Sequence, residues 1–235
     1  MTSPKAASHD ADNAAAIRLA IFDLDGTLTV RGTSVLQCLG AHFSFEDLAA
    51  DLVARHDRGM ISNDTVSSTV ATLLGNRHHD ELVAALHSLR MRPAVRQTVH
   101  ALRHRGVHCG IATSTFDFAA DHIARTNGFD VGRVMSTTLE WTTDGRTTGS
   151  VQRAIRPEHK VSFIRRQCRE LGISPRDVMV IGDSRADVPA MEEAGLAVGL
   201  DAVPEVRRIA DVSVDGLGEL VNAVKDRLPA PKARQ

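Results

Sequence analysis

The sequence predicts an α/β protein built on a doubly wound parallel sheet, with a helical insertion and a small β-hairpin flap. Short apolar runs alternate with segments of helical periodicity along most of the 235 residues. Such alternation predicts parallel strands with helices on both faces of the sheet. The apolar runs are nearly continuous, as expected for strands that are buried on both faces. The predicted core is therefore Rossmann-like.

Each element follows from a local pattern. The apolar runs predict strands at residues 19–23, 107–113, 178–183, 196–200 and 210–214. Helical periodicity between these runs predicts helices at residues 94–105, 118–126, 160–171, 188–194 and 217–227. Glycine favours the backbone conformation in which helices end. Glycines stand at the expected ends of four helices, at positions 106, 128, 172 and 195.

Two segments interrupt the alternation. Residues 35–91 show helical patterns and no good strand, which predicts a helical cap inserted after the first strand. Residues 136–149 carry β-branched residues on both sides of an Asp-Gly dipeptide, which predicts the hairpin flap. The expected division is a core of residues 16–34 and 92–228, a cap of residues 35–91, a disordered tail of residues 1–15 and a tail of residues 229–235.

The composition excludes several classes of function. The chain has 28 basic and 29 acidic residues and only 3% aromatic residues, so nucleic acid is not an expected partner. No apolar stretch is long enough to span a membrane, and the first residues lack a signal-peptide core, so we expect a cytoplasmic protein. Three distant cysteines, Cys38, Cys109 and Cys168, do not indicate disulfides or a zinc site.

Asp23 and Asp25, in the stretch I-F-D-L-D-G-T, follow the first predicted strand. In an extended chain residues i and i+2 point the same way, so both carboxylates can face one site at the strand end. Two like charges in a buried place need compensation, and carboxylate oxygens suit Mg²⁺. Taken alone, the pair fits a turn or a helix cap equally well.

Polar residues also follow the other two long strands. Thr113 and Ser114 end the second strand before a helix, where hydroxyl and N–H groups can bind an anion. Asp183 and Asp187, in G-D-S-R-A-D, follow the third strand. Lys160, at the start of a helix, is the candidate fixed cation. Ligands of open parallel sheets bind at the carboxyl ends of strands, so this set predicts a site for Mg²⁺ and a phosphoryl group.

The chemistry of these groups indicates phosphoryl transfer. A carboxylate such as Asp23 can attack phosphorus and form an aspartyl-phosphate. Asp25 can protonate the leaving oxygen and later activate water. Mg²⁺, Lys160 and Thr113 would offset the charge on the phosphoryl oxygens.

In order and spacing these residues resemble the four motifs of the haloacid dehalogenase superfamily of phosphohydrolases. The matching stretches are D-L-D-G-T at 23–27, Thr113, Lys160 and G-D-S-R-A-D at 182–187. T-S-T-F-D-F-A-A-D-H-I and L-E-W-T-T-D-G are most similar to the phosphoserine phosphatase-like branch, of subfamily IB type. The position of the helical insertion matches the first type of cap in this superfamily.

The resemblance implies a role for each matching residue. Asp23 would be the nucleophile and Asp25 the general acid and base. Mg²⁺ would be bound by the side chains of Asp23 and Asp183 and by the backbone carbonyl of Asp25. Thr113 and Lys160 would bind phosphate, and Asp187 would support Lys160 or a metal-bound water.

The predicted function is an Mg²⁺-dependent phosphomonoester hydrolase that acts on a small phosphorylated metabolite through an aspartyl-phosphate. Phosphoserine phosphatase proper, a phosphotransferase or phosphomutase, and a non-catalytic binding protein remain alternatives. The branch usually carries a Glu where this chain reads V-R-G-T-S at 30–34, which argues against phosphoserine. The candidate specificity residues are Arg31, Thr33, Arg55 and Met60. We expect a monomer or a homodimer.

Overall fold

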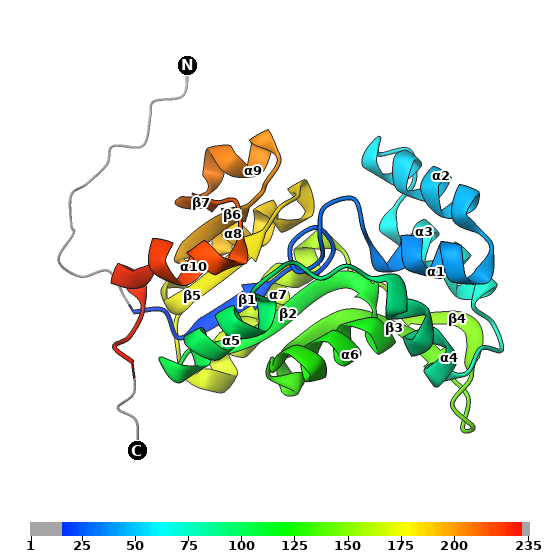
Figure 1. The fold of residues 1–235 in the computed structure, drawn as a ribbon, viewed down its shortest axis with the longest axis horizontal. Coiled ribbons are helices and arrows are strands. Elements are labelled where there is room, and N and C mark those ends of the chain that lie inside the picture. Colours follow the sequence, from blue (N-terminus) through cyan, green and yellow to red (C-terminus); the bar gives the residue numbers. More distant parts are fainter. Residues whose placement is uncertain (1–15, 232–235) are drawn as a thin grey trace.

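The computed structural model describes residues 16–231. It consists of a sheet with helices on both faces and a helical cap at one end (Figure 1). The predicted tail 1–15 and most of the predicted tail 229–235 lie outside the described residues. No helix within residues 16–231 combines the length and the apolar character needed to cross a bilayer.

The sheet has seven strands in the order β4-β3-β2-β1-β5-β6-β7. All neighbours pair in parallel except β3 and β4, which are antiparallel. The predicted fold class is confirmed. The strands are β1 (Leu19–Phe22), β2 (His108–Phe116), β3 (Val134–Trp141), β4 (Thr147–Arg153), β5 (Val178–Gly182), β6 (Leu196–Leu200) and β7 (Val212–Val214).

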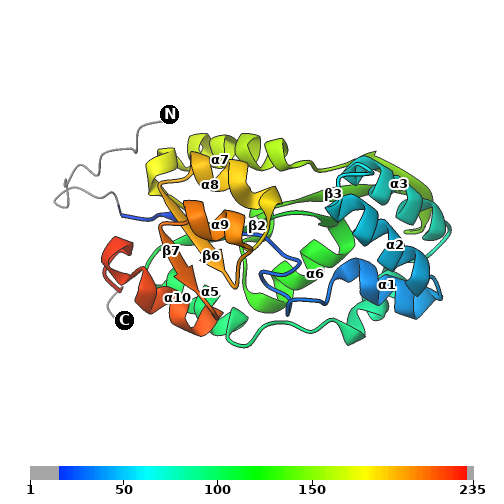
Figure 2. The ribbon, with the colours of Figure 1, turned by 90° about the horizontal axis from the view of Figure 1, so that it is seen from above.

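Helices cover the two faces of the sheet separately (Figure 2). One face carries α5 (Val95–His104), α6 (Asp117–Asn127) and α10 (Leu217–Ala223). The other face carries α7 (Pro157–Leu171), α8 (Val188–Glu193) and α9 (Pro204–Ile209). Both faces of the parallel sheet are therefore buried, as the continuous apolar runs require.

Strand β1 lies at the centre of the sheet and contributes to both cores. Leu19 and Ile21 pack in the cluster beneath α7 and α8, whereas Ala20 and Phe22 pack in the cluster beneath α5 and α6. All four side chains are at most 1% exposed. The strand cannot slide by one residue without exchanging these two sets, so the position of Asp23 at its end is fixed.

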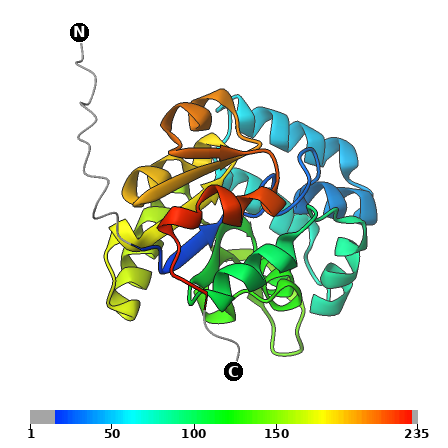
Figure 3. The same cartoon turned by 60° about the vertical axis from the view of Figure 1, so that its left-hand side comes forward.

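Residues 35–88, between β1 and α5, form a separate group of helices at one end of the sheet (Figure 3). Ser34 begins the first of them with a capping box, in which its side chain accepts from the Gln37 N–H while the Gln37 side chain accepts from the Ser34 N–H. These helices are α1 (Val35–Phe43), α2 (Glu46–Asp57), α3 (Asn63–Leu73), α4 (His79–Ala84) and the 3₁₀-helix η1 (Ala85–Ser88).

The β3–β4 hairpin joins the cap to the sheet. It is longer than predicted, because β3 begins at Val134 and also pairs with β2. The Asn76 N–H donates to the Thr147 carbonyl at 2.8 Å, and the Thr147 N–H donates to the Arg77 carbonyl at 2.9 Å. Arg156, which precedes α7, forms a two-pronged ion pair with Asp64 of α3. The hairpin therefore fixes one side of the cap.

Two elements differ from the sequence prediction. Helix α9 was not predicted, although Pro204 stands at its first position, where proline favours a helix start. The predicted helix 217–227 ends instead at Ala223, and a 3₁₀-helix, η5 (Lys225–Arg227), follows it. At Val224 the backbone leaves the α-helical region, with φ −111° and ψ 14°, which separates the two.

Candidate active site

The predicted site lies at the carboxyl end of the central strands. Asp23 directly follows β1, and Asp183 directly follows β5, its parallel neighbour. The Asp23 N–H donates to the Ile181 carbonyl at 2.9 Å, so the pairing of the two strands continues to the site. Residues distant in the sequence therefore meet because their strands are adjacent and in register.

Lys160 lies between two of the carboxylates. Its Nζ is 2.7 Å from Asp23 Oδ1 and 2.7 Å from Asp187 Oδ1, and the residue is only 4% exposed. Burial acts to lower the pKa of Lys160, but the two carboxylates outweigh it and hold the pKa above its ordinary value. Lys160 is therefore a charged, fixed ammonium group.

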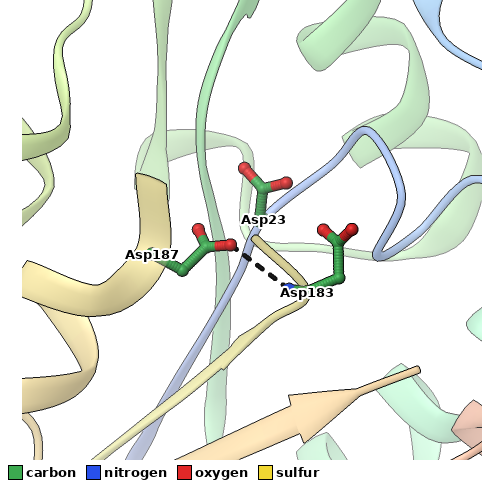
Figure 4. Close-up of side chains that lie close together, drawn as sticks. All are labelled: Asp23, Asp183 and Asp187. Atoms are coloured by element: carbon green, nitrogen blue, oxygen red, sulfur yellow. Dashed lines mark hydrogen bonds between the residues drawn. The ribbon is translucent and has the colours of Figure 1, made fainter. Parts of the chain in front are cut away.

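Asp187 uses both of its carboxylate oxygens within the protein. Oδ1 accepts from Lys160, while Oδ2 accepts from the backbone N–H of Asp183 at 3.2 Å and of Ser184 at 3.1 Å. In Figure 4 its carboxylate is turned towards the Asp183 backbone, while the carboxylates of Asp23 and Asp183 lie side by side. This geometry makes Asp187 a support for Lys160 and for the loop that carries Asp183.

The carboxylates are short of positive charge. Asp23, Asp25, Asp183 and Asp187 share one buried ammonium, which leaves three formal negative charges. Burial, aided by Asp187, raises the pKa of Asp183 to about 6. Burial likewise raises the pKa of Asp23, against the opposing effect of Lys160, with Asp187 and Asp183 adding to the rise. Carboxylates with such raised pKa values are stabilised in their charged form by a cation.

The free oxygens are placed to bind that cation. Asp183 Oδ1 accepts from the Thr27 hydroxyl at 3.1 Å, and Asp23 Oδ1 accepts from Lys160. Within residues 16–231 the Oδ2 atom of each accepts no hydrogen bond. Ligand atoms of Asp23, Asp183 and Asp187 lie within 4.8 Å of one another. This all-oxygen donor set fits a hard divalent metal ion.

Asp25 occupies a different environment from Asp23. Its Oδ2 accepts from the Thr115 hydroxyl, and its Oδ1 accepts from the Val35 N–H at 3.0 Å. Burial raises the pKa of Asp25, while these two hydrogen bonds oppose the rise. Asp25 is thus held between β2 and α1, and its raised pKa favours the protonated form more than in an exposed carboxyl group.

Sequence reasoning missed the groups that hold these carboxylates. Thr27 binds Asp183, and Thr115 binds Asp25, although both lie in stretches that were singled out for other residues. The pattern D-L-D-G-T contains the signal for Thr27, and T-S-T contains that for Thr115. The Val35 N–H has no signal of its own, because it belongs to the first turn of α1 and only the fold brings it to Asp25.

The remaining predicted residues divide into two groups. Arg31, Thr33 and Ser114 line a cavity between the core and the cap. The predicted end of the second strand at Thr113 is wrong, because β2 continues to Phe116. Thr113 is buried inside β2, where its Oγ1 accepts from the Thr115 N–H at 3.1 Å.

Two predicted specificity residues lie elsewhere. Arg55 is paired with Asp51 on the surface of α2, and Met60 is 64% exposed. The structure does not bring either of them to the cavity. Arg55 lies on the face of α2 that is exposed to solvent, whereas Val53 and His56 of the same helix line the cavity. Met60 lies in the turn between α2 and α3.

Comparison with known proteins assigns the family. The pattern of the haloacid dehalogenase-like hydrolases matches residues 20–192. The chain belongs to this family. It is 32% identical over 224 residues to a phosphoserine phosphatase from Polaromonas sp., a match that covers 88% of this chain and 90% of that protein. A probable phosphoserine phosphatase from Schizosaccharomyces pombe is 27% identical, over 88% of this chain and 68% of that protein.

Solved structures agree on the fold. A phospho-aspartyl intermediate analogue of a phosphoserine phosphatase superposes with a TM-score of 0.75 at 20% identity, over 88% of this chain and 98% of that chain. A HAD family hydrolase from Salmonella enterica has a TM-score of 0.81 at 16% identity, over 91% and 72%. The predicted branch and enzyme class are confirmed: the chain is a phosphatase of the haloacid dehalogenase superfamily.

Proposed function

We propose that this phosphatase hydrolyses a small phosphorylated metabolite with Asp23 as the nucleophile and Mg²⁺ as the metal. The proposal rests on the different hydrogen-bond partners of two neighbouring carboxylates. Asp23 lies 2.7 Å from a buried ammonium, whereas Asp25 is held by a hydroxyl and a backbone N–H. One carboxylate is therefore suited to attack and the other to proton transfer.

In the first half of the reaction the Asp23 carboxylate attacks phosphorus in line. A bond forms between its oxygen and phosphorus as the bond to the leaving oxygen breaks. Asp25 gives its proton to that oxygen, so the product leaves as an alcohol. Lys160 offsets the negative charge of the phosphoryl oxygens, and Thr113 and Ser114, inside β2 next to Thr115, are the proposed donors to those oxygens.

In the second half water attacks the aspartyl-phosphate. Asp25, now a carboxylate, takes a proton from the water, and inorganic phosphate leaves as the Asp23 carboxylate is restored. Thr115 and the Val35 N–H keep Asp25 at one place for both proton transfers. Both halves therefore depend on a carboxylate whose position is set by the second strand and by the first cap helix.

Asp23 and Asp183, through their free oxygens, and Asp25, through its backbone carbonyl, are the proposed ligands of Mg²⁺. When bound, the ion would offset phosphoryl charge and the repulsion among the carboxylates. Asp187 is not needed as a ligand, since protein donors already occupy both of its oxygens.

The test is phosphate release from a chromogenic aryl phosphate, with and without Mg²⁺. We expect metal-dependent release in the wild type and a loss of more than about 10³-fold in Asp23→Asn. Asp121→Asn, a change of the same size on the partly exposed surface of α6, is the control and should leave the rate unchanged. Near-normal turnover by Asp23→Asn, or release that ignores the metal, would contradict the proposal.

The domain boundaries and the partners are proposals of the same kind. We propose a core of residues 16–34 and 92–228 and a cap of residues 35–91, because α1–α4 and η1 all begin and end inside the latter range. A cytoplasmic monomer or homodimer remains the prediction. Sedimentation of the purified protein measures the oligomeric state directly.

A further inference from the structure

A cavity of about 340 Å³ lies between the catalytic carboxylates and the cap. Asp25 and Asp183 line its core side, and side chains of α1, α2 and α3 line its cap side. Pockets of this size hold small organic ligands. The cavity adjoins the carboxylate that is proposed to protonate the leaving oxygen, so the alcohol part of the substrate would occupy it.

The cap side of this cavity has an aliphatic interior and a polar rim, where Gln37, His56 and Asp57 line it as exposed residues. Val66 and Val70, one helical turn apart on α3, face it together with Val53 of α2. Leu36 of α1 and Phe116 of β2 extend the apolar lining. A hydrocarbon group placed here would be removed from water, which is favourable by roughly 25 cal/mol per Å² of apolar surface.

Two polar side chains of α3 lie beside these valines: Asn63, whose amide donates to the Ile155 carbonyl at 2.7 Å, and Ser67. Ser67 lies between the valines of α3, and only 4% of the residue is exposed. Within residues 16–231 its hydroxyl makes no hydrogen bond, although its oxygen is not fully enclosed by the protein. A nearly buried hydroxyl without a partner can bind one neutral polar group of a ligand.

The α3 side of the cavity carries no cation for a substrate carboxylate, since Asn63, Val66, Ser67 and Val70 are the α3 residues that line it. Arg31 is the only arginine or lysine among the described residues that line the cavity. Its side chain is 47% exposed and pairs with Asp201 at 4.0 Å. Asp25, Asp57 and Asp183 contribute three acidic groups to the same lining. A carboxylate against the α3 lining would lose water without gaining a positive partner, which is unfavourable.

We propose that the enzyme prefers phosphomonoesters whose alcohol carries a hydrocarbon body and no carboxylate. This inference rests on the proposed phosphatase reaction and names its substrate class. The hydrocarbon contacts Val53, Val66 and Val70, and a neutral polar group on it accepts from or donates to Ser67. Amino-acid phosphates such as phosphoserine fall outside the class, because their carboxylate would meet aliphatic and acidic side chains.

The first test compares pentyl phosphate with its analogue in which the terminal methyl group is a carboxylate. The two leaving groups are equally reactive, so kcat/KM reports the cavity alone. We expect the neutral ester to be preferred by at least about tenfold, and to exceed phosphoserine likewise. Equal rates, or a preference for the carboxylate, would overturn the inference but leave the phosphatase reaction standing. Failure to hydrolyse any ester would instead refute the proposed function.

The second test changes the charge of the cap side. Val66→Arg places a cation in the lining, and Ser68→Arg places one at the neighbouring exposed position of α3. We expect Val66→Arg to reduce or reverse the preference for the neutral ester, and Ser68→Arg to preserve it. An unchanged preference in a folded Val66→Arg protein would contradict the inference.

A milder variant keeps the test decisive if Val66→Arg does not fold. Ser67→Ala should lower kcat/KM several-fold for pentyl phosphates that bear a neutral hydroxyl and leave the plain ester unaffected. Ser68→Ala is its control. Equal effects of Ser67→Ala on both esters would refute the role of the Ser67 hydroxyl.

Discussion

The carboxyl edge of the sheet and the cap side that faces it are built in opposite ways. At the carboxyl edge of the sheet each of three carboxylates accepts a hydrogen bond from a side chain. Lys160 donates to Asp23, Thr115 donates to Asp25 and Thr27 donates to Asp183. On the cap side the buried part of the lining is aliphatic apart from Ser67, whose hydroxyl has no partner among the described residues. The sheet edge is arranged before substrate arrives, whereas the cap side gains its contacts from the substrate.

This contrast assigns chemistry and selectivity to different parts of the chain. Charged groups that are fixed by hydrogen bonds lose much when one member is removed, because its partners stay buried and uncompensated. Aliphatic contacts are individually weaker and tolerate change. Substitutions at the sheet edge should therefore abolish the reaction, and substitutions in the cap should change which substrate is used.

The largest expected effect is that of Lys160→Met. The change leaves Asp23 and Asp187 buried without their ammonium, so we expect the free energy of unfolding to fall by about 3–5 kcal/mol without metal. Phosphate release should be lost as well. Denaturant unfolding measures the first effect. Lys225→Met, at an exposed lysine, is the control and should change neither quantity. An equally stable Lys160→Met protein would show that the carboxylates do not depend on this charge.

Gly26→Ala tests the sheet edge more locally. Gly26 has φ +85°, and a Cβ there would lie 2.5 Å from Asp183 Oδ2. Gly32 has φ +80°, and a Cβ built there would have no atom within 4 Å. Gly32→Ala therefore introduces a similar backbone strain, of about 1 kcal/mol, without the contact to a carboxylate. We expect Gly26→Ala to weaken metal binding and activity at least about tenfold beyond Gly32→Ala. Titration with Mg²⁺ measures the difference, and equal affinities would remove Asp183 from the proposed metal site.

Val70→Ala tests the cap side of the cavity. Val70 lines the cavity and is 1% exposed, so the loss of two methyl groups should cost roughly 1.5 kcal/mol of stability. It should also raise KM for hydrocarbon esters while kcat changes little. Val99→Ala, equally buried on α5 but outside the cavity lining, should cost similar stability and leave KM unchanged. If both variants change KM alike, the cavity does not bind the alcohol.

The smallest expected effect concerns the ion pair between cap and core. Arg156 holds the pKa of Asp64 below its ordinary value. A carboxyl group whose pKa is depressed by folding stabilises the protein above its unfolded pKa, near 4, and loses that contribution as pH falls through the folded value. Asp64→Asn should therefore cost at most about 0.5 kcal/mol at neutral pH, because exposed pairs are screened.

The check is the free energy of unfolding at neutral pH and again below pH about 3, where we expect the difference from wild type to shrink. Asp51→Asn, which breaks the exposed pair with Arg55 within α2, is the control. A pH-independent cost for Asp64→Asn would mean that the side chain acts through packing and not through charge.

Much of this arrangement could be predicted from local patterns. The strands came from apolar runs and the catalytic carboxylates from their position directly after them. Asp187 was predicted from its place after the third strand and Lys160 from its place at the start of a helix, and the structure pairs the two at 2.7 Å. The carboxylates are predictable because the end of a buried strand has one location in a parallel sheet.

The cap was predictable only as a set of helices. Arg55 and Met60 were chosen as cap residues that could face the site, but the α2 and α3 faces that meet the core are set by packing between helices. Val66, Ser67 and Val70 carry no chemical signal in the sequence. The sequence also gives no signal for the hydrogen bond from the Val35 N–H to Asp25, because this bond depends on where α1 begins relative to β1.

The most direct test of the account is to find the phosphoryl group on the enzyme. Wild type is mixed with Mg²⁺ and substrate, quenched in acid and digested, and the peptides are examined by mass spectrometry. The account predicts one added phosphoryl group on the peptide that carries Asp23, labile to hydroxylamine and lost in Asp23→Asn. Phosphate release without this phosphopeptide, or a phosphoryl group on another residue, would contradict Asp23 as the nucleophile.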